Sequence, residues 1–261
     1  MKVTFLGTGT SQGVPMIGCK CAVCTSSDPR DARWRCSILV EDGVRILIDT
    51  TPELRLQMLR AGVDSIDGVI MTHEHADHIM GFDDLRRFCD ISGQPVEVYC
   101  NEGTLKRLSE VYHYVFNSVK IVPGYLRMNA HVIKGSWNWG DLRITPLPVP
   151  HGAVQTMGFL FESRGEKKLA YIPDCASFPE EVSRLVENVP VLVIDGLRDR
   201  PHPTHLTVQQ ALEAGSRCKA QKTYITHLTH DVSHAQREAE LSKSEICKNA
   251  FVAYDGLILE I

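Results

Sequence analysis

One short stretch predicts both the fold and the chemistry of this chain: Thr72-His73-Glu74-His75-Ala76-Asp77-His78. It follows the apolar run Gly68-Val69-Ile70-Met71, which is typical of a buried strand. In an extended segment the first two histidines point to the same side, because side chains alternate along a strand. A turn into a helix after them aims Asp77 and His78 in another direction. The stretch therefore predicts two ligands for each of two metal ions. The alternative is a solvated polar turn that contains histidines by chance.

The pattern H-x-H-x-D-H resembles the metal-binding motif of the metallo-β-lactamase fold hydrolases. The family's remaining ligands are then expected later in the chain, and the candidates are His151, Asp174 and His227. Each candidate lies where a strand-like run passes into a loop, the usual place for ligands carried by a sheet. A single histidine in such a place is more often structural, but three candidates in this order favour a metal site.

The resemblance implies an α/β (α+β) fold, the four-layer αββα sandwich of two mixed sheets with helices on the outer faces. Residues 1–261 are expected to form a single domain of this kind. The seven ligands would divide into two sets around one bridge: His73, His75 and His151 for one ion, Asp77, His78 and His227 for the other, with Asp174 between them. Histidine and carboxylate ligands suit Zn or Mn, with Fe as a further option.

The resemblance further implies hydrolysis by a hydroxide that both metal ions bind, because two neighbouring cations lower the pKa of water to near neutrality. Asp77 is expected to orient this hydroxide as well as to bind a metal. A side-chain nucleophile is not expected, since the chain contains no G-x-S-x-G motif. The chain is therefore predicted to be a dinuclear metal-dependent hydrolase.

A second candidate metal site lies near the start of the chain, in Cys19-Lys20-Cys21-Ala22-Val23-Cys24. The spacing C-x-C-x-x-C places three thiols close together, and in a reducing compartment such a cluster indicates a structural zinc bound by Cys19, Cys21 and Cys24. Three thiolates leave one position in a tetrahedral shell, and the candidate for it is His230. A zinc held there would fix the position of His227. The alternative is a reactive or redox cysteine cluster.

The loop from Asp195 to His205 contains candidates for substrate binding. Arg198 and Arg200 suit phosphate, because a guanidinium group presents a planar fork to phosphate oxygens. His205 precedes an expected helix and is predicted to be the general acid that protonates a leaving alkoxide. In the phosphodiesterase branch of the family, an additional histidine in this region has that role. The alternative is that His205 is a surface residue at the start of the helix.

Within the family, the chain resembles most closely the PhnP-like phosphoribosyl cyclic phosphodiesterase branch. The matching residues are Gly13-Val14-Pro15, Gly18 to Cys24, Thr72 to His78, His151, Asp174, His205 and Thr226 to His230. The expected activity is therefore that of a phosphoric diester hydrolase acting on a small phosphodiester, such as a cyclic ribose phosphate. Residues 113–140 match no motif of this branch, and their aromatic side chains are expected to line either the substrate site or the edge of the core.

Other functions compete with this prediction. A glyoxalase-II-like thioester hydrolase would use the same metal ligands, and only His205 with its neighbouring arginines favours phosphate. A tRNase Z-like nuclease is less expected, because the chain has no basic insertion and a net charge of -4. A β-lactamase is disfavoured because no cysteine ligand of that branch is evident. A non-catalytic metal-binding scaffold is hard to reconcile with an intact set of seven ligands.

The composition, with 43% hydrophobic and 23% charged residues, is that of an ordinary soluble globular protein. No apolar run approaches the ~20 residues that span a bilayer, and the start passes directly into a strand without a signal peptide. A cytoplasmic protein that binds neither membranes nor nucleic acid is expected. Most of the nine cysteines are expected to be small buried residues. The resemblance implies a homodimer.

Periodicity and end signals predict helices over residues 52–62, 81–90, 102–112, 179–187, 207–218 and 233–247. A hairpin is expected around Asp42-Gly43, and the run Val191–Asp195 is typical of a buried strand. The segment Gly7–Gly13 lacks the helix that follows a dinucleotide-binding loop and is expected to form a tight loop near the active site. A final pair of strands is expected near Phe251 and Leu257.

Overall fold

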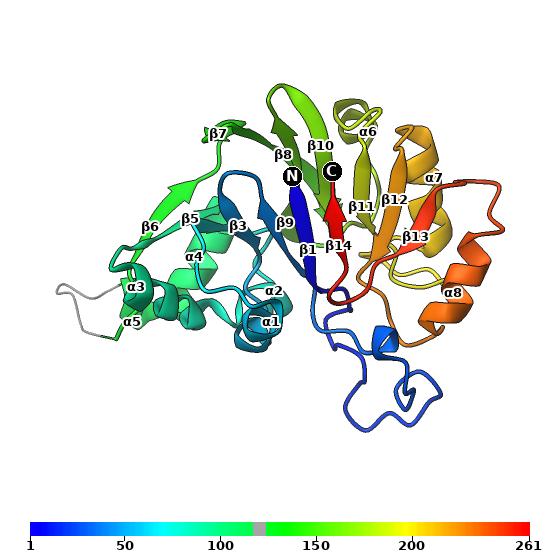
Figure 1. Ribbon diagram of the computed structural model, residues 1–261, viewed down its shortest axis with the longest axis horizontal. Coiled ribbons are helices and arrows are strands. Elements are labelled where there is room, and N and C mark those ends of the chain that lie inside the picture. Colours follow the sequence, from blue (N-terminus) through cyan, green and yellow to red (C-terminus); the bar gives the residue numbers. More distant parts are fainter. Residues whose placement is uncertain (117–123) are drawn as a thin grey trace.

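The computed structural model describes residues 1–116 and 124–261, and its framework is a pair of seven-stranded sheets (Figure 1). The first sheet is mixed: along the order given next, the first three strand pairs are antiparallel and the other three are parallel. Its strand order across the sheet is β14 (Ile258–Glu260), β1 (Lys2–Gly7), β2 (Ser37–Glu41), β3 (Arg45–Ile48), β4 (Gly68–Ile70), β5 (Val96–Cys100) and β6 (Met128–Val132). The expected hairpin is formed by β2 and β3.

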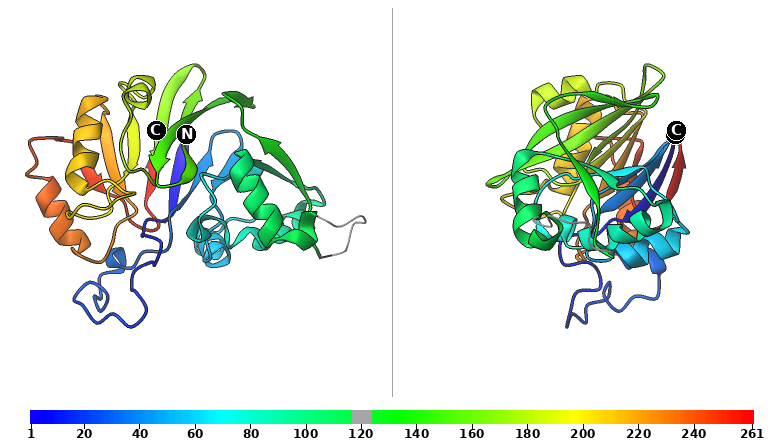
Figure 2. Two further views of the ribbon diagram at one scale, coloured as in Figure 1. Left: turned by 180° about the vertical axis from the view of Figure 1, so that it is seen from behind. Right: turned by 90° about the vertical axis from the view of Figure 1, so that its left-hand side faces the viewer.

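The second sheet is also mixed and faces the first (Figure 2). Along the order given next, its first three strand pairs are parallel and the other three are antiparallel. The strand order is β13 (Ala250–Val252), β12 (Lys222–Thr226), β11 (Val191–Asp195), β10 (Glu166–Ile172), β9 (Val154–Ser163), β8 (Leu142–His151) and β7 (Trp137–Trp139).

Helices cover the outer face of each sheet. The first sheet carries α1 (Leu54–Ala61), α2 (Ala76–Ile79), η2 (Phe82–Leu85), α3 (Arg86–Ser92), α4 (Glu102–Val111) and α5 (His113–Phe116). The second sheet carries α6 (Glu180–Leu185), α7 (Val208–Arg217) and α8 (His234–Leu241). A short turn, η1 (Pro29–Asp31), lies in the loop that contains the cysteine cluster. The predicted αββα sandwich is confirmed.

The apolar side chains fall into three layers that follow from the alternation along each strand. In β2, Ile38 and Val40 point between the two sheets, whereas Leu39 points toward the helices of the first sheet. Phe159 and Phe161 of β9 fill the space between the sheets from the other side. A sheet that is covered on both faces needs apolar residues at odd and at even positions of its strands. This requirement explains the continuous apolar runs in the sequence.

Several expected elements differ in length or place. The segment 81–90 forms the 3-10 turn η2 followed by α3, rather than one helix. The helix expected over residues 233–247 ends at Leu241, where Ser242 and Ser244 use their hydroxyl groups to bond nearby backbone atoms. The last two strands do not pair with each other, because β13 lies beside β12 and β14 lies beside β1.

The irregular region 113–140 contains α5, β6 and β7, and part of it lies outside the described residues. Trp137 and Trp139 of β7 pack against Tyr99 of β5, with ring centroids 5.1 and 4.9 Å apart. These two tryptophans therefore close the edge of the core between the sheets. In the part of the chain that the structure describes, there is no helix long and apolar enough to cross a membrane.

Candidate metal centre

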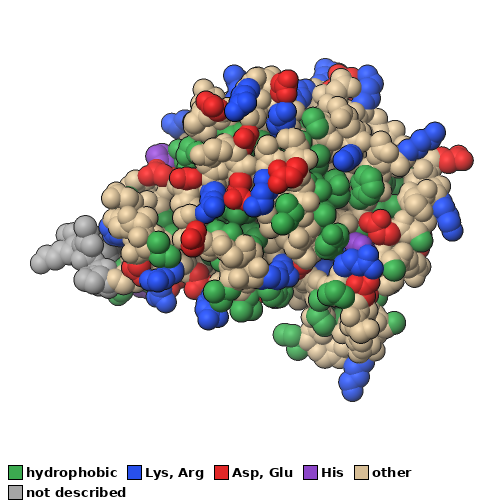
Figure 3. Space-filling view, in the orientation of Figure 1, with side chains coloured by type: hydrophobic (Ala, Val, Ile, Leu, Met, Phe, Trp, Pro, Cys, Tyr) green, Lys and Arg blue, Asp and Glu red, His purple; other side chains and the backbone are tan. Residues whose placement is uncertain are grey.

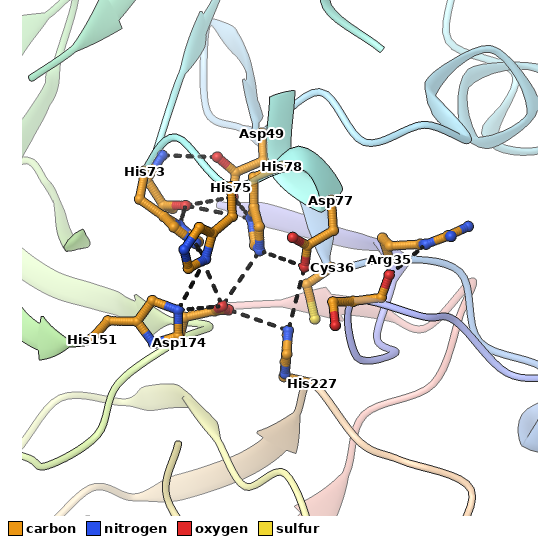
Figure 4. Close-up of polar contacts among 12 residues, drawn as sticks. Arg35, Cys36, Asp49, His73, His75, Asp77, His78, His151, Asp174 and His227 are labelled. Atoms are coloured by element: carbon orange, nitrogen blue, oxygen red, sulfur yellow. Dashed lines mark hydrogen bonds and ion pairs between the residues drawn. The ribbon is translucent and has the colours of Figure 1, made fainter. Parts of the chain in front are cut away.

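A group of three histidines gathers where β4 and β8 end. His73 and His75 follow β4 in extended backbone, and His151 is the last residue of β8. His73 Nε2 lies 2.9 Å from His75 Nδ1, and His151 Nε2 lies 3.2 Å from the same atom. Figure 4 shows the three rings pointing toward one another. One ligand nitrogen from each histidine therefore faces a common point, as a single metal ion requires.

A second group lies beside the first. Asp77 and His78 belong to the short helix α2, so the chain turns at this point and aims them away from His73 and His75. His78 Nε2 lies 3.3 Å from Asp77 Oδ2, and His227 Nε2 lies 3.8 Å from that oxygen. The division of the motif between two groups is the one that the sequence predicts.

Asp174, which follows β10, lies between the two groups (Figure 4). Its Oδ2 is 3.7 Å from His73 Nε2 and 3.5 Å from His151 Nε2. The same oxygen is 3.5 Å from His78 Nε2, and Oδ1 is 3.5 Å from His227 Nε2. One carboxylate thus reaches both groups, as a bridging ligand must.

Several buried ligand atoms of this cluster lack hydrogen bonds to protein groups in the described part of the chain, and a metal cation would satisfy them. His78 Nε2, His227 Nε2 and Asp174 Oδ1 are buried and have no hydrogen-bond partner among the described residues. Buried polar atoms are almost always paired, so a converging set of unpaired ligand atoms indicates a bound ion. Five imidazoles and two carboxylates around two neighbouring points are the ligand types that Zn, Mn and Fe accept.

The pKa values of the histidines in the cluster also indicate a site for metal cations. Burial lowers the pKa of His73 well below its usual value and that of His151 to about 4, so both rings are neutral, the form that binds metals. Burial also acts to lower the pKa of His78, but the carboxylates of Asp174 and Asp77 outweigh it and raise that pKa well above its usual value. The acidic groups therefore require positive charge at this point, which divalent cations supply.

Residues that the sequence did not single out hold the ligands in place. Asp49, at the end of β3, is fully buried and contacts His78 Nδ1 at 2.7 Å through Oδ2. It also accepts hydrogen bonds from the backbone N–H and the hydroxyl of Thr72. The carbonyl of Thr204 lies 2.8 Å from Nδ1 of His151. Such contacts fix which ring nitrogen faces the metal.

His205 lies beside the metal ligands, and the alternative of a surface position is wrong. Its side chain is 11% exposed, and its ring centroid is 4.8 Å from that of His151 and 4.7 Å from that of His227. Its Nδ1 contacts Asp195 Oδ2 at 2.8 Å, which leaves Nε2 outside this contact. Asp195, the last residue of β11, is held in turn by the backbone N–H of Cys175.

A cavity of about 290 Å³ opens next to His205. The predicted phosphate ligands Arg198 and Arg200 both line it, and Arg200 lies 3.6 Å from Asp231. Thr10, Ser11 and Gln12 of the glycine-rich loop, which was expected near the active site, also line the cavity. The cavity places positive charge beside the metal ligands.

The cysteine cluster assembles around His230. The Sγ atoms of Cys19, Cys21 and Cys24 each lie 3.3 Å from His230 Nδ1, so four ligand atoms surround one point. The backbone N–H of Cys24 is the main cause that lowers the pKa of the Cys21 thiol to about 6, which favours the thiolate that zinc binds. This arrangement fits a tetrahedral structural zinc.

The backbone connects this cluster to the metal centre. Leu228, directly after His227, donates its N–H to the carbonyl of Thr8 and accepts from the N–H of Thr10. His227 itself has φ 60, a left-handed conformation that is uncommon for a residue other than glycine. These two hydrogen bonds therefore restrain the backbone next to His227, whose Nε2 lies 3.5 Å from Asp174 Oδ1.

Comparisons with known proteins agree with this geometry. The family model for the β-lactamase superfamily domain matches residues 44–228. A solved diphosphatase from the PhnP family is 38% identical and covers 99% of this chain and 96% of its own, with a TM-score of 0.87. Zn²⁺-bound PqqB from Methylobacterium extorquens, at 20% identity and a TM-score of 0.80, shares the fold over 100% of both chains.

Curated relatives carry other names. An octanoyltransferase from Porphyromonas gingivalis is 36% identical over 98% of this chain, but the chain spans only about half (51%) of that protein's length. Coenzyme PQQ synthesis protein B from Methylorubrum populi is 30% identical over 75% of this chain and 73% of its own. The matched family domain, the two facing sheets and the PhnP-family neighbour together show that this chain belongs to the metallo-β-lactamase superfamily of hydrolases, within which it resembles PhnP.

Proposed function

We propose that this protein is a metal-dependent phosphodiesterase that hydrolyses a small phosphodiester, such as a cyclic ribose phosphate. The observation that carries the proposal is the position of His205. Its ring lies against His151 and His227 while its Nδ1 is held by Asp195. A proton donor in this place is useful for an alkoxide leaving group, which needs protonation as the P–O bond breaks.

The residues of the site have separate roles in this reaction. When bound, a pair of divalent cations supplies Lewis acidity and acidifies water at neutral pH. Asp77, which reaches into the site from α2, accepts a hydrogen bond from the attacking water and thereby orients it. Arg198 and Arg200, which line the adjoining cavity, hold the phosphate oxygens. A reactive side-chain nucleophile is not needed for this scheme.

The protonation of His205 depends on the substrate. Burial lowers the pKa of His205 below its usual value, although the carboxylates of Asp174 and Asp77 act in the opposite direction. An anionic phosphate bound next to the ring adds a further negative charge, which favours the imidazolium form. Substrate binding therefore prepares the proton donor.

Three relatives bear on the substrate. The diphosphatase of the PhnP family favours phosphate chemistry, because a diphosphate link, like a phosphodiester, presents anionic phosphoryl oxygens to the site. The octanoyltransferase name favours acyl groups, which makes a thioester hydrolase the second candidate. The likeness to human tRNase Z, at 20% identity, concerns the fold and not the substrate.

The candidate zinc site bears on localisation. Its three cysteine ligands need a reducing compartment, which supports our proposal of a cytoplasmic protein.

A substrate screen distinguishes these candidates. Protein loaded with Zn or Mn is expected to hydrolyse bis(p-nitrophenyl) phosphate, measured by the absorbance of nitrophenolate, and to leave S-lactoylglutathione untouched. Metal removal with a chelator abolishes this activity, and restoring the metal recovers it. Hydrolysis of the thioester alone would reject the phosphodiesterase in favour of the acyl-group hydrolase.

A further inference from the structure

The loop that contains the cysteine cluster projects from the body of the molecule, and Asp255 joins its two ends. Residues 10–33 leave the end of β1 and return to β2 in Figure 1, and the same loop forms a separate lobe in the space-filling view of Figure 3. Asp255 Oδ1 accepts a hydrogen bond from the hydroxyl of Thr8 at 2.7 Å, and Oδ2 accepts one from the backbone N–H of Trp34, also at 2.7 Å. One carboxylate therefore fixes both sides of the base of the loop.

The carboxylate of Asp255 lies in a buried and charged environment. Its side chain is 3% exposed, and Arg60 Nη2 lies 3.7 Å from its Oδ2. Arg33, which is also buried, donates from Nη1 to the hydroxyl of Thr8 at 2.8 Å and to the carbonyl of Ala253 at 2.6 Å. A buried charge is costly unless it is paired and hydrogen-bonded, so a shift of Thr8 away from these partners is unfavourable.

Asp255 lies in the segment that connects the two sheets. Residues 253–257 lead from β13, which pairs with β12, to β14, which pairs with β1. The N–H of Ala253 donates to the carbonyl of Ile225 in β12 at 3.0 Å, and the N–H of Gly256 donates to the carbonyl of Phe5 in β1 at 2.8 Å. The segment that contains Asp255 therefore ties β12 of one sheet to β1 of the other.

The candidate metal ligands come from the same two sheets. Asp77 and His78 follow β4 of the first sheet, and His227 follows β12 of the second. A metal ion among these three side chains requires a fixed position of His227 relative to the first sheet. Leu228, the next residue, donates its N–H to the carbonyl of Thr8 at 3.1 Å. The position of Thr8 therefore restrains that of His227.

We propose that Asp255 and Thr8 are positioning residues for His227 and thereby raise the affinity for the metal ion that this histidine would bind. The inference rests on the metal centre of the proposed hydrolase, but not on its substrate. Thr8 acts through the backbone of Leu228, and Asp255 acts through the hydroxyl of Thr8. Residues that orient metal ligands without binding the metal commonly change its affinity by ~10- to 100-fold.

The other metal ion should not depend on these two residues. His151 ends β8, and β9, β10 and β11 lie between β8 and β12 in the second sheet. His73 and His75 follow β4, and β2 and β3 lie between β4 and β1 in the first sheet. Loss of the contact between Thr8 and Asp255 is therefore expected to weaken one of the two metal sites, whereas a general loss of stability would weaken both.

The test is a titration of the full chain with Co²⁺ after its active-site metal has been removed, followed by visible absorption. Thr8→Val replaces the hydroxyl by a methyl group and removes the contact with Asp255. The Kd of one binding step is expected to rise by about 10-fold or more, and that of the other step to change by less than about twofold. His227→Ala, which deletes a ligand, identifies the step that should respond. Thr8→Ser keeps the hydroxyl and should bind both ions as the wild type does.

Thr223→Val provides the matched control. Thr223 is a buried threonine of β12 as well, and its hydroxyl contacts the thiol of Cys247 at 3.6 Å, at the other end of the strand from His227. This variant should leave both binding steps unchanged. Circular dichroism checks that each variant is folded, and Thr8→Ala is the second variant that removes the hydroxyl, without a methyl group against the carboxylate.

Two results in the folded Thr8 variants would overturn the proposal: an unchanged second step, or an equal weakening of both steps. A Thr8→Ser variant that binds as weakly as Thr8→Val would overturn it as well. A wild type that binds no pair of Co²⁺ ions would remove the metal centre and this inference with it. Because the readout is metal binding, a failure of the proposed phosphodiesterase activity leaves these results unchanged.

Discussion

Replacement of Asp174 by alanine is expected to lower kcat/KM for bis(p-nitrophenyl) phosphate by roughly 10³-fold or more. Its two carboxylate oxygens lie 3.5 to 3.7 Å from ligand nitrogens of both groups, so its loss removes the link between them. Metal ions supply several kcal/mol of transition-state stabilisation, and each ~1.4 kcal/mol is a factor of ten in rate. Steady-state kinetics with added metal measures the loss.

A surface aspartate provides the matched control for this change. Asp90 of α3 is 49% exposed and has only a distant ion pair with Arg87, so Asp90→Ala should change kcat/KM by less than about twofold. Metal content and circular dichroism, both measured on each variant, separate loss of metal from loss of folding. Near-normal activity of Asp174→Ala would show that the two ligand groups do not act as one centre.

Replacement of His205 by alanine is expected to separate two kinds of substrate. Hydrolysis of an alkyl phosphodiester should fall by about 10²- to 10⁴-fold, because an alkoxide needs the proton that His205 donates. Hydrolysis of bis(p-nitrophenyl) phosphate should fall by less than about tenfold, since nitrophenolate leaves without protonation. The measurement is kcat/KM for both substrates with wild-type and variant protein.

Two variants sharpen this comparison. Asp195→Asn, which alters the contact with His205 Nδ1, should reproduce the same selectivity in weaker form. His131→Ala, at the edge strand β6, should affect neither substrate. An equal loss on both substrates in His205→Ala would instead assign His205 to binding of the phosphate group.

The fold and the ligand positions were largely predictable because they depend on local patterns. Apolar runs that end at His73, Asp174 and His227 are strands whose ends carry polar residues, and strand ends at one edge of a sheet meet in space. The motif also contains its own turn, since α2 begins at Ala76. The αββα architecture itself came from the resemblance of these residues to a known family.

The residues that orient the ligands were not predictable in the same way. Asp49 follows a buried strand and Asp195 ends one, which was visible in the sequence, but their contacts with His78 and His205 depend on how separate segments pack. The same holds for the last two strands, whose short apolar runs do not specify a sheet. A strand end in the sequence indicates a position at the sheet edge, but not the partner that it meets there.

The measurement that tests the central claim most directly is anomalous X-ray diffraction from crystals grown with zinc. Three peaks per chain are predicted: one among Cys19, Cys21, Cys24 and His230, and two that flank Asp174. Of these two, one should lie among His73, His75 and His151 and the other among Asp77, His78 and His227. A single peak, or none, beside Asp174 in metal-saturated crystals would contradict the account.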